Sequence, residues 1–199
     1  MMQALGNSAR RFRTDRRGAA AIEFAFIAPI LLVLYFMTME VSQAIETNKK
    51  VGRIASMVGD LVAQQPRVGT TDLDNILDIG AAIIQPYGRS RPTIIIEHIE
   101  VEAGNANPKA FVRWSRKIEG VNKSEAVPKN TETLVPEQLR VGDTHLVRVT
   151  TQLGYKPVIA WTAEQKTALG LASAFSTLNM SEQYYLRPRM SLKVACDNC

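Results

Sequence analysis

Cysteine and histidine are both scarce in this sequence, with two residues of each among 199. Two cysteines exclude a disulfide-rich miniature scaffold, and they exclude a zinc site with four cysteine ligands from one chain. The two histidines, His98 and His145, leave little material for a metal or acid–base centre. A Gly-rich phosphate loop, a GxSxG elbow and an HExxH pair are missing from the sequence. We therefore expect no enzyme activity, no catalytic residue, no metal site and no cofactor.

Most of the excess positive charge lies in the first 18 residues. This segment holds five arginines against the single Asp15, whereas the remainder carries 19 basic and 18 acidic side chains. A nucleic-acid-binding domain has its basic residues clustered on the folded body, so we expect no nucleic-acid partner, and no motif indicates a small-molecule substrate. With 46% hydrophobic and 22% charged residues, the chain is neither disordered nor a polytopic membrane protein.

A long apolar run follows the arginines. Residues Ala19–Met39 include one charged side chain, that of Glu23. About 20 apolar residues in a helix cross the hydrocarbon core of a bilayer, so this run predicts one span of a bacterial inner membrane. The flanking arginines should stay in the cytoplasm, which places residues 40–199 in the periplasm. Glu23 is unexpected here, because a carboxylate in a spanning helix costs about 2.5–3.5 kcal/mol at the bilayer centre.

The order of residues around Gly18 indicates proteolytic processing. A basic leader ends at Gly18, the apolar run begins at Ala19, and Glu23 is the fifth residue after the glycine. This order resembles type IV pilin-like precursors, and the string GAAAIEFAFIAPILL resembles more specifically the TadE/TadF pseudopilins of the tight-adherence, or Flp, pilus system. The resemblance implies a minor pilin that a prepilin peptidase cuts after Gly18, with Ala19 as the new N-terminus.

The resemblance also implies how such a protein assembles. In the pilin class the glutamate at this position guides subunits into the assembly, and we carry that role to Glu23. Its carboxylate would pair with the new α-amino group of a neighbouring subunit, which offsets the cost of burying either charge alone. The implied partners are the inner membrane, the prepilin peptidase, other pilins and the pilus assembly platform. The implied location is the inner membrane, and the pilus or cell surface if the subunit enters the filament.

Three other interpretations of the sequence remain open. A signal peptidase that cuts after Ala44, in the small-x-small sequence Ser42-Gln43-Ala44, would release a soluble periplasmic protein. The length of the apolar run and the charge of Glu23 count against this interpretation. An uncut single-span protein would be a periplasmic scaffold of a secretion or envelope complex. A membrane-tethered thiol oxidoreductase would use Cys196 and Cys199.

Cys196 and Cys199 form the sequence Cys-Asp-Asn-Cys. A thioredoxin-like redox motif needs this spacing between a strand and a helix, where the thiol pKa is lowered. No helical pattern follows Cys199. We therefore expect a small disulfide loop, as the oxidising periplasm allows; a bridge between chains and half of a shared zinc site are the alternatives.

Beyond the predicted span, the sequence indicates an α+β fold with a long N-terminal helix and an antiparallel sheet, as in pilins. Apolar residues at heptad-like spacing continue the helix to Gln64, and we expect this second half to pack at least in part against its own domain. We divide the chain into a cytoplasmic leader (1–18), a transmembrane and projecting helix (19–65) and a periplasmic α+β domain (66–199).

The remaining patterns predict one further helix and several strands. The helix begins at a capped start near Thr71. The polar stretch 119–132 predicts a loop, and the stretch 158–176 predicts an apolar helix or irregular segment. Strands are expected at 93–102, 110–117, 145–155 and 180–189.

The aromatic and imidazole side chains carry no recognisable site pattern. No serine or cysteine lies at a spacing that pairs it with His98 or His145, so we expect both histidines at the surface or rim of the sheet. We expect the larger aromatic residues in the core and at its rim. These residues are Trp114, Trp161, Tyr184 and Tyr185.

Overall fold

The computed structural model describes residues 18–104, 108–158 and 178–199. Most of the predicted apolar segment 158–176, with Trp161, lies outside the described residues, as does almost all of the predicted leader. The chain divides into two compact units, Met1–Gln43 and Ala44–Cys199, and each is described by itself. One helix, α2 (Ala19–Ala63), contributes residues to both units.

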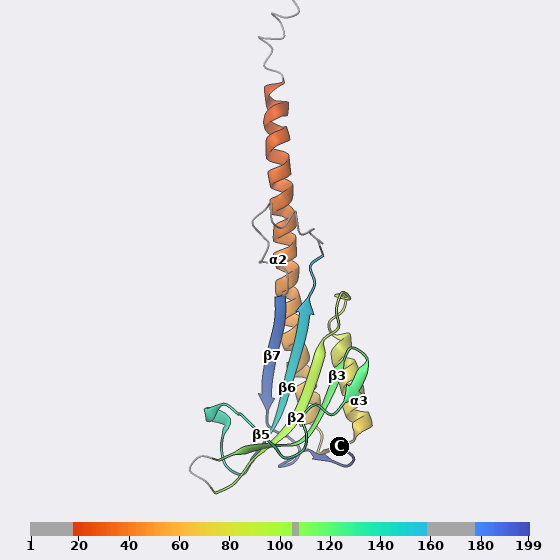
Figure 1. Cartoon of the computed structure of the whole chain (residues 1–199), viewed down its shortest axis with the longest axis vertical. Helices are drawn as coiled ribbons and strands as arrows, with labels where there is room; N and C mark the ends of the chain where they lie inside the picture. The colour runs from red at the N-terminus through yellow and green to blue at the C-terminus, as the bar shows by residue number, and fades with distance from the viewer. Residues whose placement is uncertain (1–17, 105–107, 159–177) are drawn as a thin grey trace, which may run out of the picture. The chain divides into compact units, whose positions relative to one another are not determined.

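The second unit has the α+β architecture that the sequence predicts, with helices and an antiparallel sheet (Figure 1). After α2, its elements are β1 (Arg67–Val68), α3 (Thr70–Ala82), β2 (Thr93–Val101), β3 (Ala110–Glu119), β4 (Asn122–Ser124), β5 (Thr131–Thr133), the 3₁₀ turn η1 (Glu137–Leu139), β6 (Thr144–Tyr155), β7 (Leu178–Leu186) and β8 (Ala195–Cys196).

Six strands form the main sheet in the order β4-β3-β2-β6-β7, and β5 also pairs with β3. All neighbours in this sheet are antiparallel. The pairing of β2 with β3 shifts between His98 and Ile99 because β3 carries a bulge there. The short strands β1 and β8 form a separate parallel pair. The predicted strands 93–102, 110–117 and 145–155 are thus confirmed.

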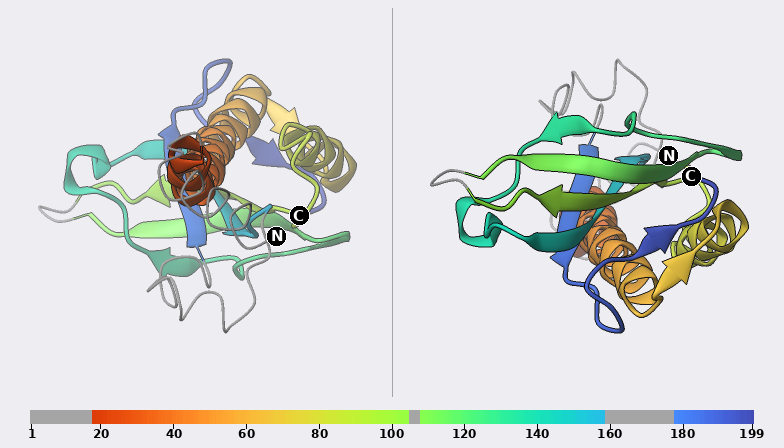
Figure 2. Two further views of the ribbon diagram at one scale, coloured as in Figure 1. Left: turned by 90° about the horizontal axis from the view of Figure 1, so that it is seen from above. Right: turned by 90° about the horizontal axis from the view of Figure 1, so that it is seen from below.

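The second half of α2 and helix α3 cover one face of the sheet, on the same side in both views of Figure 2. The buried residues of α2 recur at helical spacing, as expected for an amphipathic helix on a sheet. They are Val51, Ile54, Ala55, Val58 and Val62. They contact the buried residues of α3 and of the central strands in one apolar core. The prediction that this half of the helix packs against its own domain is confirmed.

Two glycines allow helices α2 and α3 to pack closely against each other and against the sheet. A β-carbon added at Gly59 of α2 would overlap the side chain of Leu186 on β7. A β-carbon added at Gly80 of α3 would lie 2.6 Å from Val58 Cγ2 and 3.0 Å from Ile94 Cδ1. The helices therefore approach each other and the sheet more closely than any larger residue at these positions would allow.

The opposite face of the sheet is covered near one end by the segment that leads from β4 to β6. A second apolar cluster lies there, and it includes Ile99, Val112, Val135 and Leu146. The hydroxyl of Ser115 on β3 donates to the carbonyl oxygen of Val127 at 2.7 Å. The core of the domain therefore has two parts, one on each face of the sheet.

Two predicted boundaries are wrong. The stretch 119–132, predicted as a loop, contains β4 and the first two residues of β5. Gly120 (φ 66°) makes the tight turn from β3 to β4, and Asn130 (φ 63°) turns the chain into β5, which pairs with β3. Strand β7 covers Leu178–Leu186 where 180–189 was predicted, because beyond Leu186 the chain leaves the sheet and Arg189 N–H donates to Ala63 O.

Candidate functional site

The first half of α2 exposes apolar side chains on all of its faces. Gly18 stands in the turn before the helix, and Ile22 N–H donates to Gly18 O at 3.1 Å. The exposed fraction is 69% for Phe24, 73% for Phe26 and 62% for Ile30. The helix is long and apolar enough to cross a membrane, and none of its most apolar window is buried within the chain. Such a surface needs lipid or neighbouring helices around it.

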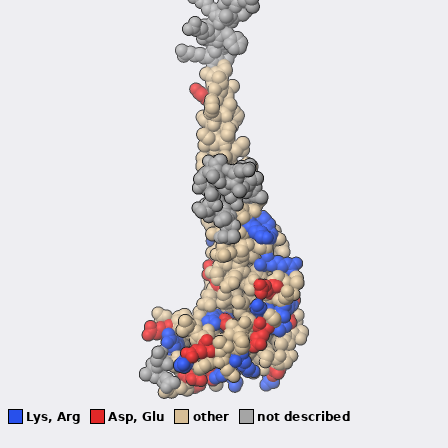
Figure 3. Space-filling view, viewed as in Figure 1, with Lys and Arg blue, Asp and Glu red and all other residues tan. Residues whose placement is uncertain are grey.

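Glu23 lies on this apolar helix one turn after Ala19, so the two residues share a helix face. In Figure 3 this stretch of the helix is tan except for one acidic group near its start. A chain that began at Ala19 would carry its α-amino group about 6 Å along the axis from Glu23. The amine would add to the partial positive charge of the helix N-terminus. In such a chain the Glu23 carboxylate and the α-amino group of Ala19 would lie about one helical turn apart.

Polar side chains near the end of the apolar run are satisfied within the helix itself. The hydroxyl of Thr38 donates to Leu34 O at 2.8 Å, and that of Ser42 donates to Thr38 O at 2.9 Å. Bonds of this kind remove the need for water around a hydroxyl. Pro29 also lies inside the helix, as prolines do in membrane helices.

Cys196 and Cys199 lie within disulfide distance, with 5.7 Å between their α-carbons. Cys196 is in β8, and the pair is part of a segment that pairs with β1 and reaches the start of α3. The pairing of these two cysteines in the natural protein stays a prediction.

His98 is not at the surface or rim, and that prediction is wrong. Only 2% of the residue is exposed. Its ring lies between those of Trp114 and His145, with centroids 5.4 and 5.3 Å away and nearly parallel planes. Within the described part of the chain, neither nitrogen of the His98 ring has a hydrogen-bond partner. Burial, followed by the nearby His145, lowers the pKa of His98 to about 3.

The other predicted core and rim residues mostly lie as expected. Trp114 is buried and donates from Nε1 to Val194 O at 2.9 Å. His145 and Tyr185 are half-buried, and Tyr184 is exposed. Burial also lowers the pKa of His145, although Glu100 opposes this effect. Burial therefore favours the neutral form of both histidines, and among the described residues His98 Nδ1, His98 Nε2 and His145 Nδ1 have no hydrogen-bond partner.

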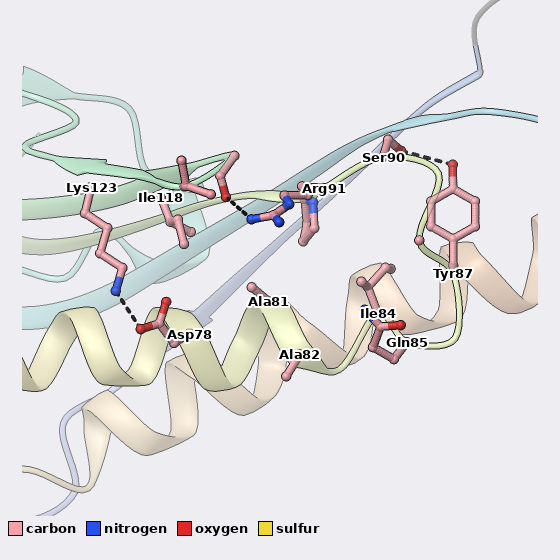
Figure 4. Close-up of a pocket in the computed structure, with 14 residues that line it drawn as sticks. Asp78, Ala81, Ala82, Ile84, Gln85, Tyr87, Ser90, Arg91, Ile118 and Lys123 are labelled. Carbon is pink, nitrogen blue, oxygen red and sulfur yellow. Dashed lines mark hydrogen bonds and ion pairs between the residues drawn. The ribbon is translucent and has the colours of Figure 1, made fainter.

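A cleft of about 450 Å³ lies between the end of α3, the loop 84–92 and the turn from β3 to β4 (Figure 4). Lys123 Nζ bonds to Asp78 Oδ2 at 2.6 Å at one end, and the Tyr87 and Ser90 hydroxyls lie 3.0 Å apart at the other. Arg91 lines the cleft as well. These contacts hold neighbouring elements together. The described side chains in the cleft do not pair a nucleophile with a general base, so the cleft does not indicate a catalytic site.

No group of three or more His, Cys, Asp or Glu side chains that could hold a metal ion occurs in residues 18–104, 108–158 and 178–199. The exposed apolar helix with Gly18 and Glu23 is therefore the candidate site. Its exposed apolar surface is suited to contact with lipid or with neighbouring helices.

Comparison with known proteins supports this assignment. Residues 18–58 match the family model described as TadE-like protein. No curated protein and no solved structure matches the chain. The matched segment begins at Gly18 and includes Glu23, so the resemblance drawn from those residues is confirmed. The family is a pilus component and not a family of enzymes. The chain therefore carries a TadE-like segment at residues 18–58, which is consistent with a TadE-like pilin of Tad pilus systems.

Proposed function

We propose that this protein is a minor pilin, or pseudopilin, that takes part in the assembly of a tight-adherence (Flp) type IV pilus. The observation that carries the proposal is the exposed apolar helix with Gly18 directly before it and Glu23 one turn inside it. A prepilin peptidase cuts the precursor after Gly18 on the cytoplasmic side. Residues 19–39 hold the cut protein in the inner membrane, and the α+β domain lies in the periplasm.

In this proposal Glu23 acts in assembly and not in catalysis. After cutting, the α-amino group of Ala19 has a reference pKa near 7.7–8, so it is largely protonated near pH 7. Glu23 of one subunit pairs with this amine on a neighbouring subunit at membrane depth. The pairing partners are other pilins, and the assembly platform receives the subunit. Cys196 and Cys199 form an intrachain disulfide in the oxidising periplasm.

The test of processing is the intact mass and the N-terminal sequence of the protein extracted from its native membranes. We expect a start at Ala19 with the apolar helix retained. We also expect Gly18→Glu to abolish cutting, because the resemblance implies a small residue before the cut. Asn7→Glu, which adds the same charge elsewhere in the leader, is the matched control and should be cut normally.

The other starts would contradict the proposal in different ways. A start at Met1 or Met2 would indicate an uncut membrane-anchored scaffold. A start at Ile45 would indicate a secreted soluble protein and would remove the assembly role of Glu23. Cleavage of the Gly18→Glu protein at the normal position would show that the peptidase does not recognise Gly18.

The test of pairing is Glu23→Gln. We expect normal insertion and cutting but a fall in assembled pili of about tenfold or more, because an unpaired charge at membrane depth costs about 2.5–3.5 kcal/mol. Pili can be counted by electron microscopy of sheared filaments. Glu46→Gln on the same helix is the control, since Glu46 is 68% exposed and pairs with Lys50. Normal piliation of the Glu23 variant would disprove the pairing.

A further inference from the structure

Residues 187–199, here called the strap, tie together elements that are distant in the sequence. Arg189 N–H donates to Ala63 O at the end of α2 at 2.8 Å. Val194 is buried in the main core, and its carbonyl accepts from Trp114 Nε1 on β3. The strap therefore contacts the last residue of α2 and the aromatic stack of the sheet.

The last five residues of the strap fasten it beside α3, where β8 lies along β1 (Figure 2). Ala195 N–H donates to Pro66 O and Asp197 N–H to Val68 O, each at 3.2 Å. Asp197 Oδ1 lies 2.8 Å from Arg67 Nη1. This two-residue parallel pairing has few backbone bonds, so it needs further support.

Asn198 supplies part of that support by capping α3. Its side-chain oxygen accepts a hydrogen bond from Thr70 N–H at 2.8 Å. Thr70 is the first residue of α3, and Gly69 before it has no side chain with which to cap the helix. Asp72 Oδ2 accepts from Gly69 N–H, at 2.9 Å, and not from the N–H of Thr70, which bonds to Asn198. The strap thus provides a cap that the local sequence of α3 lacks.

We propose that Cys196 and Cys199 are a thiol–disulfide exchange site, and that their oxidation closes the strap over α3 while their reduction opens it. The two cysteines bracket Asp197 and Asn198, the residues that bind Arg67 and Thr70. A disulfide across four residues restricts the unfolded chain little. Its effect is therefore local: it holds Asp197 and Asn198 in the geometry that reaches β1 and α3.

The exchange needs an oxidant of the thiol–disulfide oxidoreductase class. One thiolate attacks the oxidant's disulfide and forms a mixed disulfide; the second thiolate then attacks that bond and releases the oxidant as a dithiol. Two electrons and two protons pass in total from the pair of thiols to the oxidant. The reverse step needs a dithiol reductant of the same class. One of its thiolates attacks Cys199 Sγ first, because Cys199 is exposed and Cys196 is half-buried; its second thiolate then resolves the mixed disulfide, so the reductant leaves as a disulfide and both cysteines become thiols. The inference does not depend on the pilus function.

The test is hydrogen exchange of the full chain in detergent micelles, before and after reduction with dithiothreitol. We expect exchange to rise about tenfold or more at Val68, at Thr70, at 195–198 and at the indole N–H of Trp114. The amides of β2 and β6 should keep their protection, because local opening leaves the central strands paired. The double variant Cys196→Ser with Cys199→Ser should exchange like the reduced protein without any reductant.

Two results would overturn the proposal. Equal exchange in the oxidised and reduced proteins would show that the cysteines do not hold the strap. An equal rise in β2 and β6 would show that the disulfide supports the whole domain. Asn198→Ala tests the cap separately in the oxidised protein: we expect about five- to tenfold faster exchange at Thr70 and no change with Asn122→Ala. Unchanged exchange at Thr70 in Asn198→Ala would remove the link between the strap and α3.

Discussion

Replacing Arg148 with leucine should lower the free energy of unfolding by about 3–5 kcal/mol. Arg148 of β6 forms two bonds to the Glu97 carboxylate on β2, at 2.6 and 2.8 Å. The exposed side-chain fractions are 11% for Arg148 and 6% for Glu97. The guanidinium also donates to Leu134 O at 3.0 Å and to Thr133 Oγ1 at 2.8 Å. The leucine variant leaves the Glu97 carboxylate buried without its cation, and this causes most of the loss.

Urea denaturation of the full chain in detergent micelles would measure this effect. Lys109→Leu is the matched control, because Lys109 pairs with Glu132 at 2.9 Å while both side chains are more than half exposed. An exposed pair contributes about 0–1 kcal/mol. The double variant Glu97→Leu with Arg148→Leu should recover much of the stability, since it removes both charges. Similar losses for Arg148→Leu and Lys109→Leu would contradict the argument.

The buried pair marks a limit of prediction from the sequence. The alternation of apolar residues along β6 predicts correctly that Val147 and Val149 face the main core. The same alternation places Arg148 on the other face, where the expected environment is water. The structure covers that face with the segment that includes Val135. The alternation along β6 carries no information about which distant segment covers this face. The contact between this segment and β6 could therefore not be predicted from the sequence.

The candidate site was predictable because its signal is local. Gly18, Ala19 and Glu23 lie within six residues of each other, and the apolar run that follows is continuous. A helix and its exposed apolar surface follow from that run alone. The environment of His98 depends instead on contacts among β2, β3 and β6, which are distant in the sequence, so the surface or rim position predicted for it is wrong.

The position of His98 predicts how stability depends on pH. Its ring is buried and neutral, with an unfolded-state pKa near 6.5 and a folded-state pKa of about 3. Between these values the unfolded chain binds a proton at His98 that the folded chain does not. Stability therefore falls as the pH falls below 6.5. The charged groups around it act in both directions: Glu100 raises the pKa, whereas His145, Lys193 and Arg113 lower it.

We expect the free energy of unfolding to fall by about 2 kcal/mol from pH 8 to pH 5 through His98 alone, with a limiting slope of about 1.4 kcal/mol per pH unit. His145 adds to this trend, because its pKa is also lowered. The pKa values of the Asp74 and Glu100 carboxyl groups are also lowered. The hydrogen bonds from Arg116 lower the pKa of Asp74. Burial raises the pKa of Glu100, but the hydrogen bond and the charge of Arg113 act against burial and the net shift is downward. Their contributions are lost at lower pH, so the window above pH 5 isolates the histidines.

His98→Phe is the variant that tests this origin of the pH dependence. Phenylalanine keeps an aromatic ring between Trp114 and His145 but has no nitrogen to protonate. Its unfolding free energy, measured in urea in the same micelles, should vary by at least about 1 kcal/mol less between pH 8 and pH 5 than that of the parent. At pH 8 the variant should be at least as stable, because two buried ring nitrogens without partners disappear. Equal pH dependence in both proteins would show that His98 binds protons equally in the folded and unfolded states, and the buried stack would then not explain the acid sensitivity of the domain.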